Sequence, residues 1–298
     1  AVLAVGMTLV IVIRHIDLSV GYAAGFMGAI AAILLTQYGL PVYLTIPIIL
    51  LIGVAAGLIN GFLVASVGIP AFVATLAGML IFRGALLQVT EKTGTINVRD
   101  EYFNAIGNGY IPAIAKIGGL NLSSLLIGAV AIVLYILSQI HNRRNKQKYN
   151  FKVVSTSIFV LQLVFVSAII AYITWILAGY NGISWTVIIM LLVVIVYHFL
   201  TTKTVLGRHI YAVGSNPEAA HLSGINVKKI TYVVFGSMGM LSALSGILFT
   251  SRLQSASPTA GTLFELDAIA AAYVGGVSAA GGVGKVTGSI IGAIVMAS

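Results

Sequence analysis

Long apolar segments follow one another through the whole sequence, and few charged residues separate them. Of the 298 residues, 59% are hydrophobic and only 8% are charged. Soluble domains carry about 25% charged residues. The chain has too few polar residues to cover a water-soluble globule, so we predict that it folds in a lipid bilayer.

An α-helix needs about 20 apolar residues to cross a bilayer. We therefore predict an all-α, polytopic membrane protein with about eight to ten transmembrane helices, including broken or re-entrant segments. It forms a single transmembrane domain over residues 1–298, and we expect it to be trimmed at both ends. The predicted spans are Ala1–Ile13, Ser19–Thr36, Tyr43–Ser66, Gly68–Val89, Ser123–Ile140, Val153–Gly179, Ile183–Leu200 and Ile230–Thr250. Glycines break the last apolar stretch, 266–298, which predicts two half-spans or a re-entrant pair.

Basic residues gather in two short segments, 141–152 and 201–229. Lys and Arg in short loops mark the cytoplasmic side of a membrane. Two predicted spans separate these segments, so the two share one side, and the loop 90–122 then faces outward. The net charge of +9 therefore indicates topology rather than binding to nucleic acid. The basic residues of the first segment are Arg143, Arg144, Lys146, Lys148 and Lys152.

The segment 201–229 contains a complete set of helix start and stop signals. Asn216 suits the N-cap, Pro217 the first helical position and Glu218 the positive end of the helix dipole. Gly224 suits the left-handed residue that ends a helix. A helix this short needs a packing partner. The sequence therefore predicts either a docking element for another protein or an ordinary helix lying on its own domain.

The same residues carry a resemblance to a known family. Glu218, Ala219 and Ala220, followed after three residues by Gly224, resemble the EAA motif of permease subunits in ATP-binding-cassette importers. The longer stretch 207–225 resembles the ribose, xylose and galactose permeases, and the xylose and multiple-sugar branch is the most similar. The segments 16–21, 75–84 and 266–276 agree with this family.

The resemblance implies a transport subunit that is not itself an enzyme, in the inner membrane of a bacterium. Its implied partners are an ATPase subunit, an extracytoplasmic sugar-binding protein, the lipid bilayer and a second permease copy in a homodimer. ATP and Mg would bind at the partner ATPase, and this chain would hold no cofactor. The implied ATPase-coupling residues are Asn216, Pro217, Glu218, Ala219, Ala220, Leu222 and Gly224.

Polar residues within apolar runs are costly in lipid and need a partner or a wet cavity. They are candidates for the translocation pathway, although each also has a structural explanation. Asp17 could pair with Arg14 or His15, Arg83 could extend to the membrane surface, and Asp267, like Glu265, could complement a helix dipole. Interhelical hydrogen bonds could account for the uncharged ones. The candidates are Asp17, Ser19, Asn60, Thr75, Arg83 and Asp267.

Other functions lack support in the sequence. The glycine-rich stretch 281–287 departs from a phosphate-binding loop at both its first glycine and its Ser or Thr position. There is no cysteine, no metal-ligand spacing and no catalytic grouping, which argues against an intramembrane enzyme. A branched-chain amino-acid permease and an ion-coupled secondary transporter remain as alternatives.

Overall fold

A computed structural model describes residues 1–91, 94–149, 151 and 153–298. Contacts divide the chain into two compact units, one formed by 1–108 with 189–298 and the other by 109–188. The first unit contains α1 (Val2–Val12), α2 (Val20–Thr36), α3 (Val42–Phe62), the π-helical turn η1 (Leu63–Val67), α4 (Ala71–Thr90), β1 (Ile96–Asn97), α5 (Glu101–Asn108), α9 (Val205–Ser215), α10 (Pro217–Leu222), α11 (Val227–Leu253), β4 (Ser255–Ala256), α12 (Phe264–Val274) and α13 (Val286–Ala297). The second contains β2 (Lys116–Ile117), β3 (Leu120–Asn121), α6 (Leu122–Lys148) and α7 (Thr156–Gly179), and α8 (Trp185–Lys203) belongs to both.

The described residues confirm the predicted helical membrane fold. Six segments among them are long and apolar enough to cross a bilayer: Val42–Val67, Ala71–Thr90, Leu122–Lys148, Thr156–Gly179, Trp185–Lys203 and Val227–Leu253. The helices α1, α2 and α13 are apolar but shorter. The glycine-rich tail forms two short helices, α12 and α13, as predicted. Broken segments therefore accompany the continuous spans.

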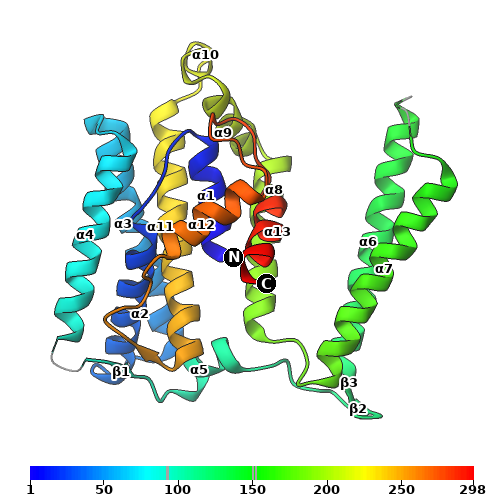
Figure 1. Ribbon diagram of the computed structural model, residues 1–298, viewed down its shortest axis with the longest axis horizontal. Coiled ribbons are helices and arrows are strands. Elements are labelled where there is room, and N and C mark those ends of the chain that lie inside the picture. Colours follow the sequence, from blue (N-terminus) through cyan, green and yellow to red (C-terminus); the bar gives the residue numbers. More distant parts are fainter. Residues whose placement is uncertain (92–93, 150, 152) are drawn as a thin grey trace. The chain divides into compact units, whose positions relative to one another are not determined.

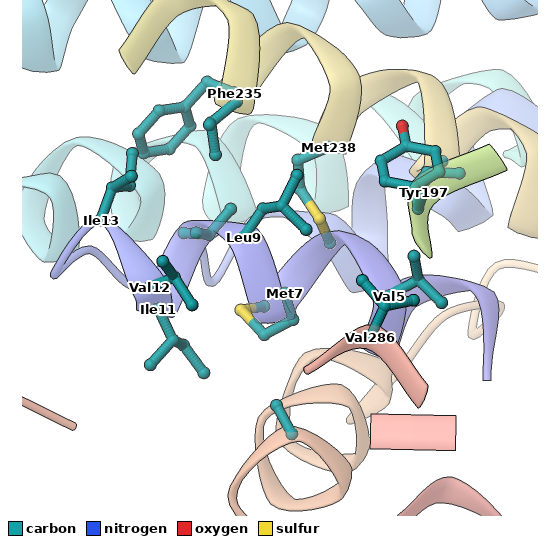
Figure 2. Close-up of a cluster of buried hydrophobic side chains, with 14 of the residues drawn as sticks. Val5, Met7, Leu9, Ile11, Val12, Ile13, Tyr197, Phe235, Met238 and Val286 are labelled. Carbon is teal, nitrogen blue, oxygen red and sulfur yellow. The ribbon is translucent and has the colours of Figure 1, made fainter. Parts of the chain in front are cut away.

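Helix α1 lies at the centre of the first unit. All of its residues from Val2 to Val12 are buried, and it contacts α11, α12 and α13. In Figure 2 its side chains face Phe235 and Met238 of α11 on one side and Val286 of α13 on another. Such a helix has no polar face because protein surrounds it on every side.

Glycines allow the helices of the first unit to approach backbone to backbone. A Cβ on Gly53 would lie 2.5 Å from the carbonyl oxygen of Gly239, and one on Gly57 would collide with the carbonyl of Phe235. Small residues serve this purpose in lipid, where apolar helices gain little from burial alone. The glycines at which an added Cβ would collide with the backbone of another segment include Gly21, Gly25, Gly53, Gly57, Gly288 and Gly292.

The two ends of α11 carry different structures (Figure 1). Helix α10 precedes α11 by a few residues, and β4 follows it and pairs with β1. With 27 residues, α11 is roughly 40 Å long at 1.5 Å per residue. The segment with α9 and α10 and the segment with β1 and α5 therefore lie at opposite ends of this unit, as the predicted topology requires. The side that each faces stays a prediction.

The second unit is built on a pair of long helices. α6 and α7 pack against each other, and Thr174 lies against Gly128 at their contact. Asn121 caps α6 by accepting from Ser124 N–H at 3.3 Å. Helix α6 continues beyond the predicted span to Lys148, because the basic residues after Ile140 extend the helix instead of forming a loop. Of the predicted basic segment, Lys152 lies outside the described residues.

Candidate translocation pathway and coupling site

Four of the six predicted pathway residues meet in one buried polar cluster. Asp17 Oδ1 accepts hydrogen bonds from the backbone N–H of Ser19 at 2.9 Å and from its hydroxyl at 2.6 Å. Asn60 Nδ2 donates to Ser19 Oγ at 2.9 Å. Thr75 Oγ1 accepts from Leu18 N–H at 3.1 Å. We call Asp17, Ser19, Asn60 and Thr75 the pathway cluster.

The pathway cluster is buried inside the first unit, where the segment between α1 and α2 meets the last turns of α3 and the first turns of α4. Asp17 is 2% exposed and Asn60 5%. Gly57, less than one helical turn before Asn60, touches Phe235 of α11. Phe235 is roughly 12 Å along α11 from its first residue, at 1.5 Å per residue. The non-helical segment between α1 and α2 therefore brings polar groups to a depth where lipid-facing segments are apolar. This arrangement is typical of transporter binding sites.

The expected local pairing of Asp17 is not formed. Arg14 Nε donates to the carbonyl oxygen of Gly214 at 2.7 Å, and Arg14 Nη2 donates to that of Ser215. The His15 ring lies 5.9 Å from the ring of Phe235. The carboxylate of Asp17 is satisfied by Ser19 because the chain turns back into α2 at that point.

The other two predicted pathway residues lie apart from the pathway cluster. Arg83 is exposed, and its guanidinium carbon lies 5.7 Å from the centre of the Tyr22 ring. Asp267 is exposed on α12 and lines a hollow of about 310 Å³ with Ala4, Ser245 and Ala293. Among the described residues, no interaction joins Arg83 to Asp267.

Glu265 is a buried acid that the sequence indicated only as a dipole partner. It is 5% exposed, and its Oε2 atom has no hydrogen-bond partner among the described residues. It lies in the first turn of α12, facing Gly21 in the first turn of α2. Two helix N-termini thus meet at a carboxylate, whose negative charge both dipoles favour. The spacing of residues along the sequence could not predict that Gly21 and Glu265 are in contact.

The predicted coupling helix is present as α10. Asn216 Oδ1 accepts from Ala219 N–H at 3.1 Å, Pro217 begins the helix, and Gly224 has a φ of +84°. These features confirm the predicted start and stop signals. The coupling role of the residues is a separate matter that geometry alone leaves as a prediction.

The exposed part of α10 is partly apolar. Leu222 is 87% exposed, and Ala219 and Glu218 are exposed as well. The helix borders a hollow of about 900 Å³ lined by Pro217 and Leu222, among others. Ala220, in contrast, is buried in the hydrophobic core of the unit and anchors the helix.

Helix α9 fixes the position from which α10 begins. Tyr211 Oη donates to the carbonyl oxygen of Gly284 at 2.6 Å. Burial raises the pKa of Tyr211 above its ordinary value, so the phenol keeps its proton and remains a donor.

The comparisons with known proteins agree with this architecture. The family described as "Branched-chain amino acid transport system / permease component" matches residues 1–298. The chain belongs to this family. It is therefore a multi-pass membrane permease, the membrane component of an ATP-binding-cassette importer in which the ATPase and the binding protein are separate subunits.

Several curated relatives resemble this permease over nearly its whole length. The xylose transport system permease protein XylH of Escherichia coli K12 is 39% identical over 297 residues, covering 100% of this permease and 73% of the relative. The ribose import permease protein RbsC of Haemophilus influenzae is 36% identical over 299 residues, covering 99% and 71%. RbsC of Escherichia coli K12 is 33% identical over 298 residues, covering 99% and 71%. No solved structure matches this permease.

Proposed function

We propose that this permease imports a monosaccharide such as xylose, ribose or galactose, driven by ATP that a partner subunit hydrolyses. The similarity to sugar permeases at 33–39% identity supports the substrate class. The pathway cluster supports it chemically, because hydroxyl, amide and carboxylate groups are the partners that sugar hydroxyls need. The burial of the pathway cluster between α2, α3 and α4 is the single observation that best supports a central role for it in transport.

The coupling step is assigned to α10. In this proposal the coupling residues named above seat α10 in the ATPase subunit, with exposed Leu222 as the apolar contact. The permease itself would bind neither ATP nor Mg. The glycine-rich loop supports this, since Gly282 N–H donates to Val12 O at 2.8 Å and Gly281 N–H to Ser278 O at 3.0 Å. These amides are used within the chain and are not free to hold phosphate.

The remaining partners follow from the same assignment. Two copies of the permease would assemble as a homodimer. A sugar-binding protein would deliver its ligand to the surface that β1 and α5, from the predicted outward loop 90–122, form with the segment 251–264. Arg83 and Asp267 would lie on the route between this surface and the pathway cluster.

Capture of the ATPase subunit tests the coupling assignment. The full-length permease is co-expressed with its genomic neighbours, solubilised and captured, as wild type and as Gly224→Asp. The matched control is Gly39→Asp, because Gly39 also has a positive φ (+62°) and open space around it. We expect Gly224→Asp alone to lose the ATPase. Equal retention in both variants would remove α10 as the dock, and capture of no ATPase by the wild type would contradict the importer.

A branched-chain amino acid is the second candidate substrate, because the family description names that class. Such a substrate carries an ammonium and a carboxylate, whereas a sugar is neutral. Uptake by proteoliposomes containing the whole transporter, with labelled xylose, ribose, galactose and leucine in parallel, decides between them. Uptake of leucine alone would overturn the proposed sugar class.

A further inference from the structure

Arg14 has a backbone conformation that its side chain does not favour. It follows α1 with a φ of +65°, in the left-handed region. Its N–H donates to Ile11 O at 2.9 Å, and His15 N–H donates to Val10 O at 3.0 Å. This is the Schellman pattern, in which glycine is the usual residue. A bulky side chain here costs free energy, which suggests that the side chain makes interactions that offset the cost.

The guanidinium of Arg14 holds the end of α9. Its Nε donates to Gly214 O at 2.7 Å and its Nη2 to Ser215 O. The last carbonyls of a helix lack helical partners, and a cation is favoured there by the helix dipole. The next residue, Asn216, caps α10. Arg14 therefore binds Ser215, the residue immediately before the N-cap of α10, which is the proposed ATPase dock.

The glycine-rich loop between α12 and α13 closes the same junction. Gly282 N–H donates to Val12 O at 2.8 Å, and an added Cβ on Gly281 would collide with Cγ of Arg14. A Cβ on Gly214 would collide with Val12 O. The ends of α1 and α9 are thus packed without space for adjustment, so displacement of one would displace the other.

A short segment connects this junction to the pathway cluster. From Arg14 to Ser19 the chain can extend over at most ~17 Å. Asp17 lies within this segment and Ser19 ends it, and both belong to the pathway cluster. Leu18 N–H donates to the hydroxyl of Thr75 on α4. The segment 14–19 is therefore held by hydrogen bonds at both of its ends.

We propose that Arg14 is a positioning residue that transmits movement of α10 to the pathway cluster. The inference rests on the proposed function, in which the ATPase moves α10. Movement of α10 shifts Ser215, and the two hydrogen bonds carry that shift to Arg14 and along segment 14–19 to Asp17. Without the guanidinium, the ATPase can still dock and hydrolyse ATP, but the pathway cluster no longer follows.

The test measures sugar uptake per ATP hydrolysed by the complete transporter in proteoliposomes. Arg14→Gly removes the side chain and relieves the backbone strain, Arg14→Gln removes the charge, and Arg14→Lys keeps a cation with a single donor group. The control is Lys148→Gln, which changes an exposed cation at the end of α6. ATPase retention is measured on every variant by capture.

We expect Arg14→Gly and Arg14→Gln to retain the ATPase and its hydrolysis while uptake per ATP falls at least tenfold. Arg14→Lys should be intermediate and Lys148→Gln unchanged. Wild-type uptake per ATP in both Arg14→Gly and Arg14→Gln would overturn the proposal. If these two variants fail to assemble, Arg14→Lys decides: uptake per ATP below wild type supports the proposal, and an unchanged value overturns it. Absence of sugar uptake or of ATPase in the wild type would instead contradict the proposed function.

Discussion

The Oε2 atom of Glu265 occupies the space that a side chain at position 21 would need, so Gly21 and Glu265 fit together only because Gly21 has no Cβ. The carbonyl oxygen of Gly261 lies 2.5 Å from the position that a Cβ on residue 21 would take. The first turns of α2 and α12 are therefore fitted to each other with no room for a methyl group.

Gly21→Ala should force these two turns apart. Overpacking of a close contact costs about 1–3 kcal/mol. We expect a lower thermal unfolding midpoint in detergent and reduced uptake. Gly84→Ala is the control, because Gly84 lies on α4 with nothing within 4 Å of its added Cβ. Equal midpoints for the two variants would contradict the close fit.

The Ser19–Asn60 hydrogen bond should appear as an interaction energy in a double-mutant cycle. Ser19→Ala leaves buried groups of Asp17 and Asn60 with one partner fewer, at a cost of about 1–3 kcal/mol. Adding Asn60→Ala should then cost at least about 0.5 kcal/mol less than Asn60→Ala alone. Unfolding by denaturant in detergent measures the free-energy cost of each single variant and of the double variant. Sugar uptake should fall in all three.

Ser66→Ala provides the control for this cycle. Ser66 also bonds another helix, through the hydroxyl of Tyr232 at 2.8 Å, but it is exposed. Its removal should change stability by less than about 0.5 kcal/mol. Strict additivity of the Ser19 and Asn60 effects would argue against a connected cluster.

Asn216→Ala should weaken α10 and its proposed interaction with the ATPase. Loss of an N-cap costs about 1 kcal/mol, which is large for so short a helix. Capture should recover several-fold less ATPase from Asn216→Ala than from the wild type. Asn216→Asp keeps a capping oxygen and should retain the ATPase, whereas equal loss in both variants would show that the cap is not the cause.

Asn108→Ala should loosen α5 from the end of α11. Asn108 Nδ2 donates to Ser251 O at 2.8 Å, and Arg252 Nη1 donates to Asn108 Oδ1 at 3.0 Å. We expect weaker capture of the sugar-binding protein with ATPase retention unchanged. Asn145→Ala, at an exposed position on α6, is the control. If Asn108→Ala captured as much binding protein as the wild type, the hydrogen bonds between Asn108 and the end of α11 would not contribute to the docking surface.

Sequence analysis could predict features set by neighbouring residues. Asn216, Pro217 and Gly224 determine the start and stop of α10 through local capping chemistry, and the structure confirms that helix. Hydropathy also located the long spans. Local signals succeed here because each depends on residues within one or two helical turns.

The meeting of distant residues could not be predicted in the same way. Asp17 and Asn60 were each expected to be polar groups in lipid, but their convergence through Ser19 depends on how three helices pack. The same packing gives Arg14 partners on α9 rather than Asp17, and places Glu265 against Gly21. Hydropathy also cannot separate α1, enclosed by protein, from α7, whose apolar side chains are mostly exposed, because lipid and protein interior favour the same residues.

The enclosure of α1 constrains the order in which the chain can reach its native state. The helices around α1 include α11, α12 and α13, which follow it by more than two hundred residues. During synthesis they emerge long after α1, so these surroundings of α1 do not exist when it enters the membrane. Its final packing must therefore be a late folding event, and substitutions in α13 should impair folding as much as those in α1 itself.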